Sequence, residues 1–179
     1  MQTTLFAQRE GSNELEITCN LNVVIAFEDV VAGKHAQRFY EYLTDRLGAD
    51  FEFTRHQWNF SLVKDPAIRE VAARDASSAD IVIVAMHGEG SLPEYIKSWI
   101  DLWAGKNANP TALVALFDRR AGSTEGRQSV RAYLEAIAHS AGMEFFAEPD
   151  NSPNFERIDP SEDFIAASDG ARVRDPQHA

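Results

Sequence analysis

The sequence is poor in cysteine and in basic residues, and each shortage excludes a class of function. Cys19 is the only cysteine, so neither an internal disulfide nor a cysteine-based metal cluster can form. Lys and Arg number 17 against 28 Asp and Glu, and the resulting formal net charge of −11 repels a phosphate backbone. Because the basic residues are scattered along the chain, we expect no nucleic-acid partner.

Long apolar segments are also missing. No stretch reaches the roughly 18 apolar residues that a membrane-spanning helix needs, so we expect no membrane partner. The first residues, MQTTLFAQREGSNELEIT, lack the basic segment and the apolar segment of a secretion signal. Together with the single cysteine, this predicts a cytoplasmic location.

What the chain does have is a set of apolar runs, and 44% of its 179 residues are hydrophobic. Three of the runs are continuously apolar, which is typical of parallel strands covered on both faces. Residues 50–60 alternate more and suit a position nearer the sheet edge. The predicted strands are residues 21–27, 50–60, 80–86, 111–117 and 143–148.

Helical patterns lie between these strands. The second predicted helix opens at Asp65, a cap that is followed by proline, and Gly142 ends the fourth. Ser91 and Glu94 form a capping box at the start of the third. The predicted buried positions are Ala36, Phe39, Tyr40, Leu43 and Leu47; Ile68, Val71, Ala72 and Ala79; Leu92, Tyr95, Ile96, Trp99, Ile100 and Trp103; and Val130, Leu134, Ile137 and Ala141.

Strands that alternate with helices predict right-handed crossovers and a parallel sheet. We therefore expect a three-layer α/β fold, flavodoxin-like, with a five-stranded parallel sheet in the order 2-1-3-4-5. Residues 21–149 form this domain, residues 1–20 an N-terminal extension with a candidate edge strand, and residues 150–179 a polar tail that is partly disordered or docked. A ligand in such a sheet binds at the loops after strands one and three, with help from strand four.

The segment HGEGSLPEYIKSWIDLW, residues 87–103, resembles the NADPH-dependent FMN reductases, in which the third strand is followed by a loop of the form PEYNGSIPGxLKNAIDWL. The resemblance extends loosely over residues 21–148. It implies a flavodoxin-like fold and FMN as cofactor. The matching positions are Gly90, Ser91, Leu92, Pro93, Lys97, Ile100 and Asp101. The residues that would contact the flavin are Gly33, Lys34, His87, Gly88, Glu89, Gly90 and Ser91.

The loop after the first strand, FEDVVAGKHAQ, departs from that family. Its members bind the FMN phosphate with a loop rich in Ser, Thr and Gly, whose hydroxyl and backbone N–H groups face the anion. Here Glu28 and Asp29 stand at that place, and the loop contains no Ser or Thr. Two carboxylates within about 5 Å of a phosphate would each repel it by roughly 3 kcal/mol at an effective dielectric constant near 20. We therefore expect no cofactor, and FMN belongs to the alternative interpretation.

A second resemblance is to response-regulator receiver domains, which hold Mg²⁺ with an acidic pair at the end of strand one. The segment VVIAFEDVV looks like that pair, with Glu28 and Asp29 in position. The phosphate-accepting aspartate of the receivers would fall near Ala85, however, and their lysine at Glu148. The hydroxyl residue that ends their fourth strand is replaced by the segment FDRR. The resemblance thus implies at most a pseudo-receiver, which uses the fold for contacts without phosphoryl transfer.

Several residues near this edge have two interpretations. Glu28, Asp29 and Asp118 are candidate ligands for a weakly bound Mg²⁺. The simpler interpretation is that Glu28 and Asp29 cap the first helix. His87 is either a general base or a hydrogen-bonded loop residue. Trp58 is a candidate for a pocket mouth or a partner surface.

The leading hypothesis for function is a non-catalytic or vestigial-site flavodoxin-like domain, pseudo-receiver-like, that acts in bacterial signalling or regulation. Its partner would be another protein or a second copy of the chain, and no catalytic residue is predicted. The alternative is an FMN-dependent NAD(P)H oxidoreductase of the FMN reductase type with an altered phosphate loop. The acidic loop at Glu28 and Asp29 favours the first hypothesis.

Overall fold

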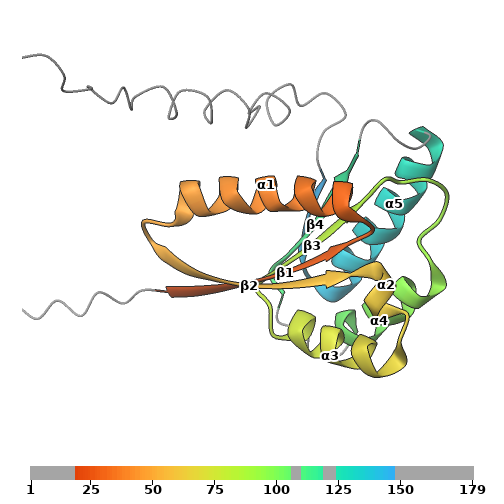
Figure 1. Cartoon of the computed structure of the whole chain (residues 1–179), viewed down its shortest axis with the longest axis horizontal. Helices are drawn as coiled ribbons and strands as arrows, with labels where there is room; N and C mark the ends of the chain where they lie inside the picture. Colours follow the sequence, from red (N-terminus) through yellow and green to blue (C-terminus); the bar gives the residue numbers. More distant parts are fainter. Residues whose placement is uncertain (1–18, 106–109, 119–123, 148–179) are drawn as a thin grey trace, which may run out of the picture.

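The computed structural model describes residues 19–105, 110–118 and 124–147. Within these ranges the strands form one sheet, in which each neighbouring pair is parallel and the order is β2-β1-β3-β4-β5. The predicted three-layer α/β fold with a flavodoxin-like five-stranded sheet is therefore confirmed (Figure 1). The strands are β1 (Cys19–Phe27), β2 (Phe51–Asn59), β3 (Ile81–Met86), β4 (Ala112–Phe117) and β5 (Glu144–Ala147).

The described helices lie on the two faces of the sheet in unequal number. Alternate strand residues point to opposite faces. Accordingly Val23 and Ile25 pack with α1, whereas Val24 and Ala26 belong to the core shared with the other helices. Figure 1 shows α1 on one side of the sheet and α3 and α4 on the other. The helices are α1 (Val30–Leu47), α2 (Phe60–Val63), α3 (Pro66–Ser77), α4 (Glu94–Ala104) and α5 (Thr124–Ala141).

Helix α4 contributes the largest side chains of the core. Trp99 and Trp103 are fully buried, and their ring centroids lie 5.6 Å apart. Ile96 and Ile100 are fully buried on the same stripe. The predicted apolar face of residues 92–103 is therefore confirmed as core. Burying each of these side chains stabilises the fold by about 1.5–3 kcal/mol.

Two local predictions are wrong. The N-cap of α4 is Pro93, and no side chain caps this helix, so the capping box of Ser91 and Glu94 does not form. The reason is that the helix begins at Glu94, which leaves Ser91 two residues outside the cap position. In α3, Val71 is 40% exposed. The buried face of that helix consists of Ala72, Ala73 and Ala76.

Other helix ends agree with the sequence. Asp65 caps α3, because its side chain accepts hydrogen bonds from the backbone N–H groups of Ala67 and Ile68, and Pro66 follows it. Gly142 has φ +72° directly after α5, the left-handed conformation that ends helices. The short helix α2 was not predicted.

The predicted N-terminal extension, residues 1–20, lies outside the described residues except for Cys19 and Asn20, which begin β1. The predicted tail, residues 150–179, lies wholly outside them. Within the described part of the chain, no helix has the length and apolar character required to cross a membrane.

Candidate functional site

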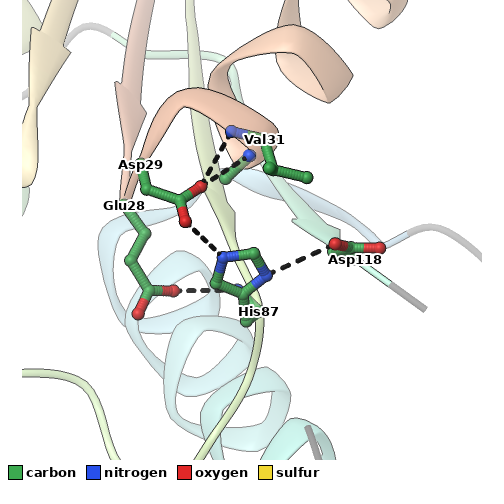
Figure 2. Close-up of polar contacts among 6 residues, drawn as sticks. Glu28, Asp29, Val31, His87 and Asp118 are labelled. Carbon is green, nitrogen blue, oxygen red and sulfur yellow. Dashed lines mark hydrogen bonds and ion pairs between the residues drawn. The ribbon is translucent and has the colours of Figure 1, made fainter. Parts of the chain in front are cut away.

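Three neighbouring strands bring the candidate residues together. β1, β3 and β4 are adjacent and parallel, so the segments that follow them emerge at the same edge of the sheet. Glu28 and Asp29 follow β1, His87 follows β3 and Asp118 follows β4. This is also the place where the strand order reverses, the usual ligand position in open α/β sheets. Figure 2 shows the four side chains converging there.

Asp29 makes contacts with both of its carboxylate oxygens. Its Oδ1 accepts hydrogen bonds from the backbone N–H groups of Val31, at 2.9 Å, and Ala32, at 3.0 Å. Its Oδ2 lies 2.7 Å from Nε2 of His87. The residue is therefore the N-cap of α1, which confirms one of the two interpretations drawn from the sequence.

Glu28, for which the sequence also suggests a role as cap of the first helix, does not cap α1. Its Oε2 accepts a hydrogen bond of 2.8 Å from the backbone N–H of His87. Its own backbone N–H donates to the carbonyl oxygen of Ala85 at 3.0 Å. Glu28 thus ties the segment after β1 to the end of β3 and to the loop that follows.

The imidazole of His87 lies between two carboxylates. Nε2 is 2.7 Å from Asp29 Oδ2, whereas Nδ1 is 3.4 Å from Asp118 Oδ2. Nδ1 is buried and has no hydrogen-bond partner, so its contact with Asp118 is an ion-pair separation rather than a hydrogen bond. His87 is thus a hydrogen-bonded loop residue, and a general-base role for it stays a prediction.

These contacts shift the acid–base equilibria of the pair. The hydrogen bond that His87 donates to Asp29 raises the pKa of His87, and the negative charges of Asp29, Glu28 and Asp118 add to this against the effect of burial. The hydrogen bond from His87 lowers the pKa of Asp29, as does the hydrogen bond from the backbone of Ala32. Both shifts favour an imidazolium bound to a carboxylate.

Of the residues predicted to contact a flavin, Gly88 has a packing role. Its φ is +76°, and a Cβ at this position would lie 2.4 Å from Cγ of Arg127 and 3.1 Å from Cδ1 of Phe117. Gly90 also has a positive φ, of +73°, but no atom lies within 4 Å of a Cβ built there. Gly90 is exposed, as are its neighbours Glu89 and Ser91.

Gly33 and Lys34, which the resemblance to FMN reductases places at the flavin, lie inside α1 rather than at its start. The N–H of Gly33 donates to the carbonyl oxygen of Asp29 at 2.8 Å, so it is already used within the helix. A Cβ on Gly33 would lie 2.9 Å from Cδ2 of Phe27, so this glycine lets the helix approach β1 closely. Lys34 is exposed.

The candidate metal ligands are turned toward His87. Glu28 accepts the backbone N–H of His87, and Asp29 and Asp118 face its ring. Within the described residues, no group of three or more His, Cys, Asp or Glu side chains is arranged to hold a metal ion. Weak binding of Mg²⁺ at Glu28, Asp29 and Asp118 stays a prediction.

The structure adds three residues that sequence reasoning passed over. Val30 is 68% exposed and Val31 53% exposed, although both are large apolar side chains at the first turn of α1. Arg127 of α5 packs against Gly88, and its Nε is buried with no hydrogen-bond partner. The two valines belong to the loop after the first strand, FEDVVAGKHAQ, whose lack of Ser and Thr is visible in the sequence, but their exposure is not.

Trp58 contacts other parts of the fold through both its indole N–H and its ring. Its Nε1 donates a hydrogen bond of 3.1 Å to Asp75 Oδ2, and its ring packs against the larger core cluster. Arg119 and Arg120, which follow Asp118, lie outside the described residues.

No protein-family model matches the chain, and no curated protein matches it. Among solved structures, the Trp repressor binding protein from Bacillus subtilis is 13% identical, covers 83% of this chain and 98% of its own, and has a TM-score of 0.47. The Smu.1420 protein from Streptococcus mutans is 9% identical, covers 82% of this chain and 95% of its own, and has a TM-score of 0.42. The flavodoxin-like assignment therefore rests on the order and direction of the strands in this chain.

Proposed function

We propose that this chain is a flavodoxin-like domain that acts by binding another protein, in signalling or regulation, and that its flavin-phosphate position is closed. The protein contacts would be made at the edge where β1, β3 and β4 end. The proposal is supported by the chemistry of that edge, beginning with the start of α1.

The observation that carries the proposal is the position of the Asp29 carboxylate. A phosphate at a helix N-terminus is held by the free N–H groups of the first turn. Here two of them, from Val31 and Ala32, already donate to Asp29 Oδ1. A phosphate would have to displace hydrogen bonds to a charged group, worth about 1.5–3 kcal/mol each, and would then meet the carboxylates of Glu28 and Asp29.

Charge repulsion adds to this competition. At about 5 Å and an effective dielectric constant near 20, each carboxylate costs a phosphate roughly 3 kcal/mol. Glu28 is held at this edge by its hydrogen bond to the His87 backbone, so it cannot turn away without losing that bond. Val30 and Val31, which follow in the sequence, are exposed apolar side chains and offer no hydroxyl group to an anion.

A second candidate function is the FMN-dependent NAD(P)H oxidoreductase. It is favoured by the loop after β3, where Gly88 and Gly90 both have positive φ and where α4 begins without a side-chain cap. Such a loop could approach a flavin ring through its backbone. It supplies no site for the FMN phosphate, which is why this function ranks second.

A titration of the purified protein with FMN, followed by flavin fluorescence, tests the proposal. We expect a colourless protein with no saturable binding in the micromolar range. The Asp29→Gly variant frees the N–H groups of Val31 and Ala32 and should bind FMN or inorganic phosphate more strongly than the wild type. Asp65→Gly is the matched control, because Asp65 caps α3 in the same way at another helix. Stoichiometric FMN in the purified protein, or sub-micromolar affinity, would overturn the proposal.

A further inference from the structure

The edge that carries the candidate site has an apolar part. Val30 and Val31 are the two most exposed large apolar side chains in the described part of the chain. Leu62, which is 49% exposed, follows β2 at the same edge, because β2 pairs in parallel with β1 up to the pair Phe27 and Asn59. Figure 1 shows α2 and the first turn of α1 at the same end of the sheet. Isolated exposed apolar residues are common, but adjacent ones at a ligand position are typical of contact surfaces.

The same edge is acidic. Glu28 and Glu89 are exposed. Glu94, at the start of α4, is exposed too, although it forms an ion pair of 2.7 Å with Lys97. Lys34, one turn beyond Val30, is the exposed basic residue of this part of α1. Among the described residues, the exposed acidic groups Glu28, Glu89 and Glu94 at this edge outnumber the exposed basic groups Lys34 and Lys64, in a chain of net charge −11.

The edge is held in one arrangement before any partner arrives. His87 contacts Asp29 and Asp118 through its ring and Glu28 through its backbone N–H, so one residue connects the segments after β1, β3 and β4. Figure 2 shows these contacts around the imidazole. A surface that is already ordered loses less conformational entropy on binding, which raises affinity.

We propose that this valine edge, defined as Glu28, Val30, Val31 and Glu89 with Leu62 at its rim, binds a cationic segment of another protein that carries aliphatic side chains. The inference rests on the proposed function and names the chemistry of the partner. Aliphatic side chains cover the valines, and Lys or Arg side chains meet Glu28 and Glu89. Charge complementarity selects such a segment over an acidic one and over a nucleic acid or an anionic membrane.

A peptide-binding experiment tests this assignment. The probe is a fluorescently labelled, designed amphipathic helix of leucine and lysine, and its counterpart has glutamate in place of lysine. Binding to the full chain is measured by fluorescence anisotropy. We expect the lysine peptide to bind saturably and the glutamate peptide not to bind. Added salt should weaken the complex, because it screens the charges at the rim.

Variants locate the binding surface. The double variant Val30→Ser with Val31→Ser should weaken binding of the lysine peptide at least about tenfold, as loss of a central apolar contact does. Glu89→Gln should weaken it less, since it removes one rim charge. The matched control is Val71→Ser with Leu102→Ser, which removes two exposed apolar side chains from α3 and α4. It should leave the affinity unchanged, and thermal unfolding confirms that each variant is folded.

The outcomes separate the two proposals. Equal weakening in the valine variant and the control, no weakening in either, or equal binding of both peptides would overturn the assignment of the valine edge. If the wild-type protein binds neither the lysine peptide nor FMN, the assignment of the valine edge is overturned. The proposed function still stands in that case. A lysine peptide that fails while FMN binds tightly overturns the proposed function as well.

Discussion

Two strand-to-helix junctions lie at the same edge of the sheet and are built in opposite ways. The junction between β1 and α1 turns directly into the helix, and the Asp29 carboxylate accepts the first N–H groups. The junction between β3 and α4 is longer, contains two glycines of positive φ and leads into a helix whose N-cap, Pro93, offers no side-chain acceptor. At the first junction a side chain of the protein, that of Asp29, accepts the N–H groups that begin the helix. At the second junction no side chain does so.

The two junctions differ in what they would present to a flavin phosphate. The second junction resembles that of the FMN reductases, but Leu92, Ile96 and Ile100 in this segment are buried in the core. The resemblance is therefore explained by packing, which any helix after a buried strand requires. The first junction carries the charges that a phosphate would meet, so its residues are more informative about binding.

The largest expected loss of stability comes from the buried side chains that anchor α4, a helix without a side-chain cap. Trp99→Ala should lower the free energy of unfolding by about 3–5 kcal/mol, because it removes a fully buried aromatic ring. Leu102→Ala on the exposed side of the same helix is the control and should change it by about 0.5 kcal/mol or less. Chemical denaturation measures both. A near-neutral Trp99→Ala would mean that the stripe does not anchor this junction.

A smaller effect separates the two glycines of the second junction. Gly88→Ala and Gly90→Ala each force a non-glycine residue into the left-handed region, which costs about 1–2 kcal/mol. Gly88→Ala should be clearly the more destabilising in urea denaturation, since its Cβ would also collide with Arg127. Equal losses in the two variants would show that α5 does not pack tightly against this loop.

The ion pair of His87 and Asp29 at the first junction should make the stability of the protein depend on pH. The pKa of His87 is raised in the folded state, so its stabilising contribution is complete below its ordinary value of 6.5 and is lost as pH rises through the folded value. The pKa of Asp29 is lowered, so its contribution is lost only as pH falls below 3.8 through the folded value.

We therefore expect His87→Gln to be less stable than the wild type at about pH 5.5 and nearer to it at about pH 9. Because the Asp29 side chain is 49% exposed, water screens the pair and the difference should not exceed about 1 kcal/mol. Thermal unfolding at both pH values measures it, with His139→Gln on the exposed surface of α5 as control. A difference in stability between His87→Gln and the wild type that grows toward high pH would contradict the assignment of an imidazolium at His87.

The smallest effect is expected at Ser91. Ser91→Ala should change the free energy of unfolding by less than about 0.5 kcal/mol, because this side chain caps no helix. Asp65→Ala, by contrast, removes a working cap and should cost about 1 kcal/mol. A comparable loss at Ser91, measured in the same denaturation series, would restore the capping box.

The sequence was most informative where an apolar pattern extends over many residues. Strand positions, the order of the sheet and the buried stripe of α4 follow from apolar patterns that span many residues. Helix α2 was missed because its four residues are too few to show a helical period. The capping box was predicted wrongly because Ser91 and Glu94 match the pattern in sequence, whereas Pro93 takes the cap position in the structure.

For the site, the ends of parallel strands correctly indicated Glu28, Asp29, His87 and Asp118 as neighbours. The sequence did not reveal that His87 would bridge Asp29 and Asp118, because this depends on side-chain conformations and on the strand register. The exposure of Val30 and Val31 was missed for a similar reason. Helix α1 begins at Val30 and buries Ala32 and Ala36, which leaves Val30 and Val31 on its exposed side.

Asp29 accepts the N–H groups of Val31 and Ala32, and we propose that it thereby closes the start of α1 to phosphate. Amide-resolved NMR, with FMN and then inorganic phosphate added to the labelled protein, tests this at the two groups themselves. We expect the Val31 and Ala32 amide signals to stay in place in the wild type and to move saturably in Asp29→Gly. A saturable shift of these two signals in the wild-type protein would contradict it.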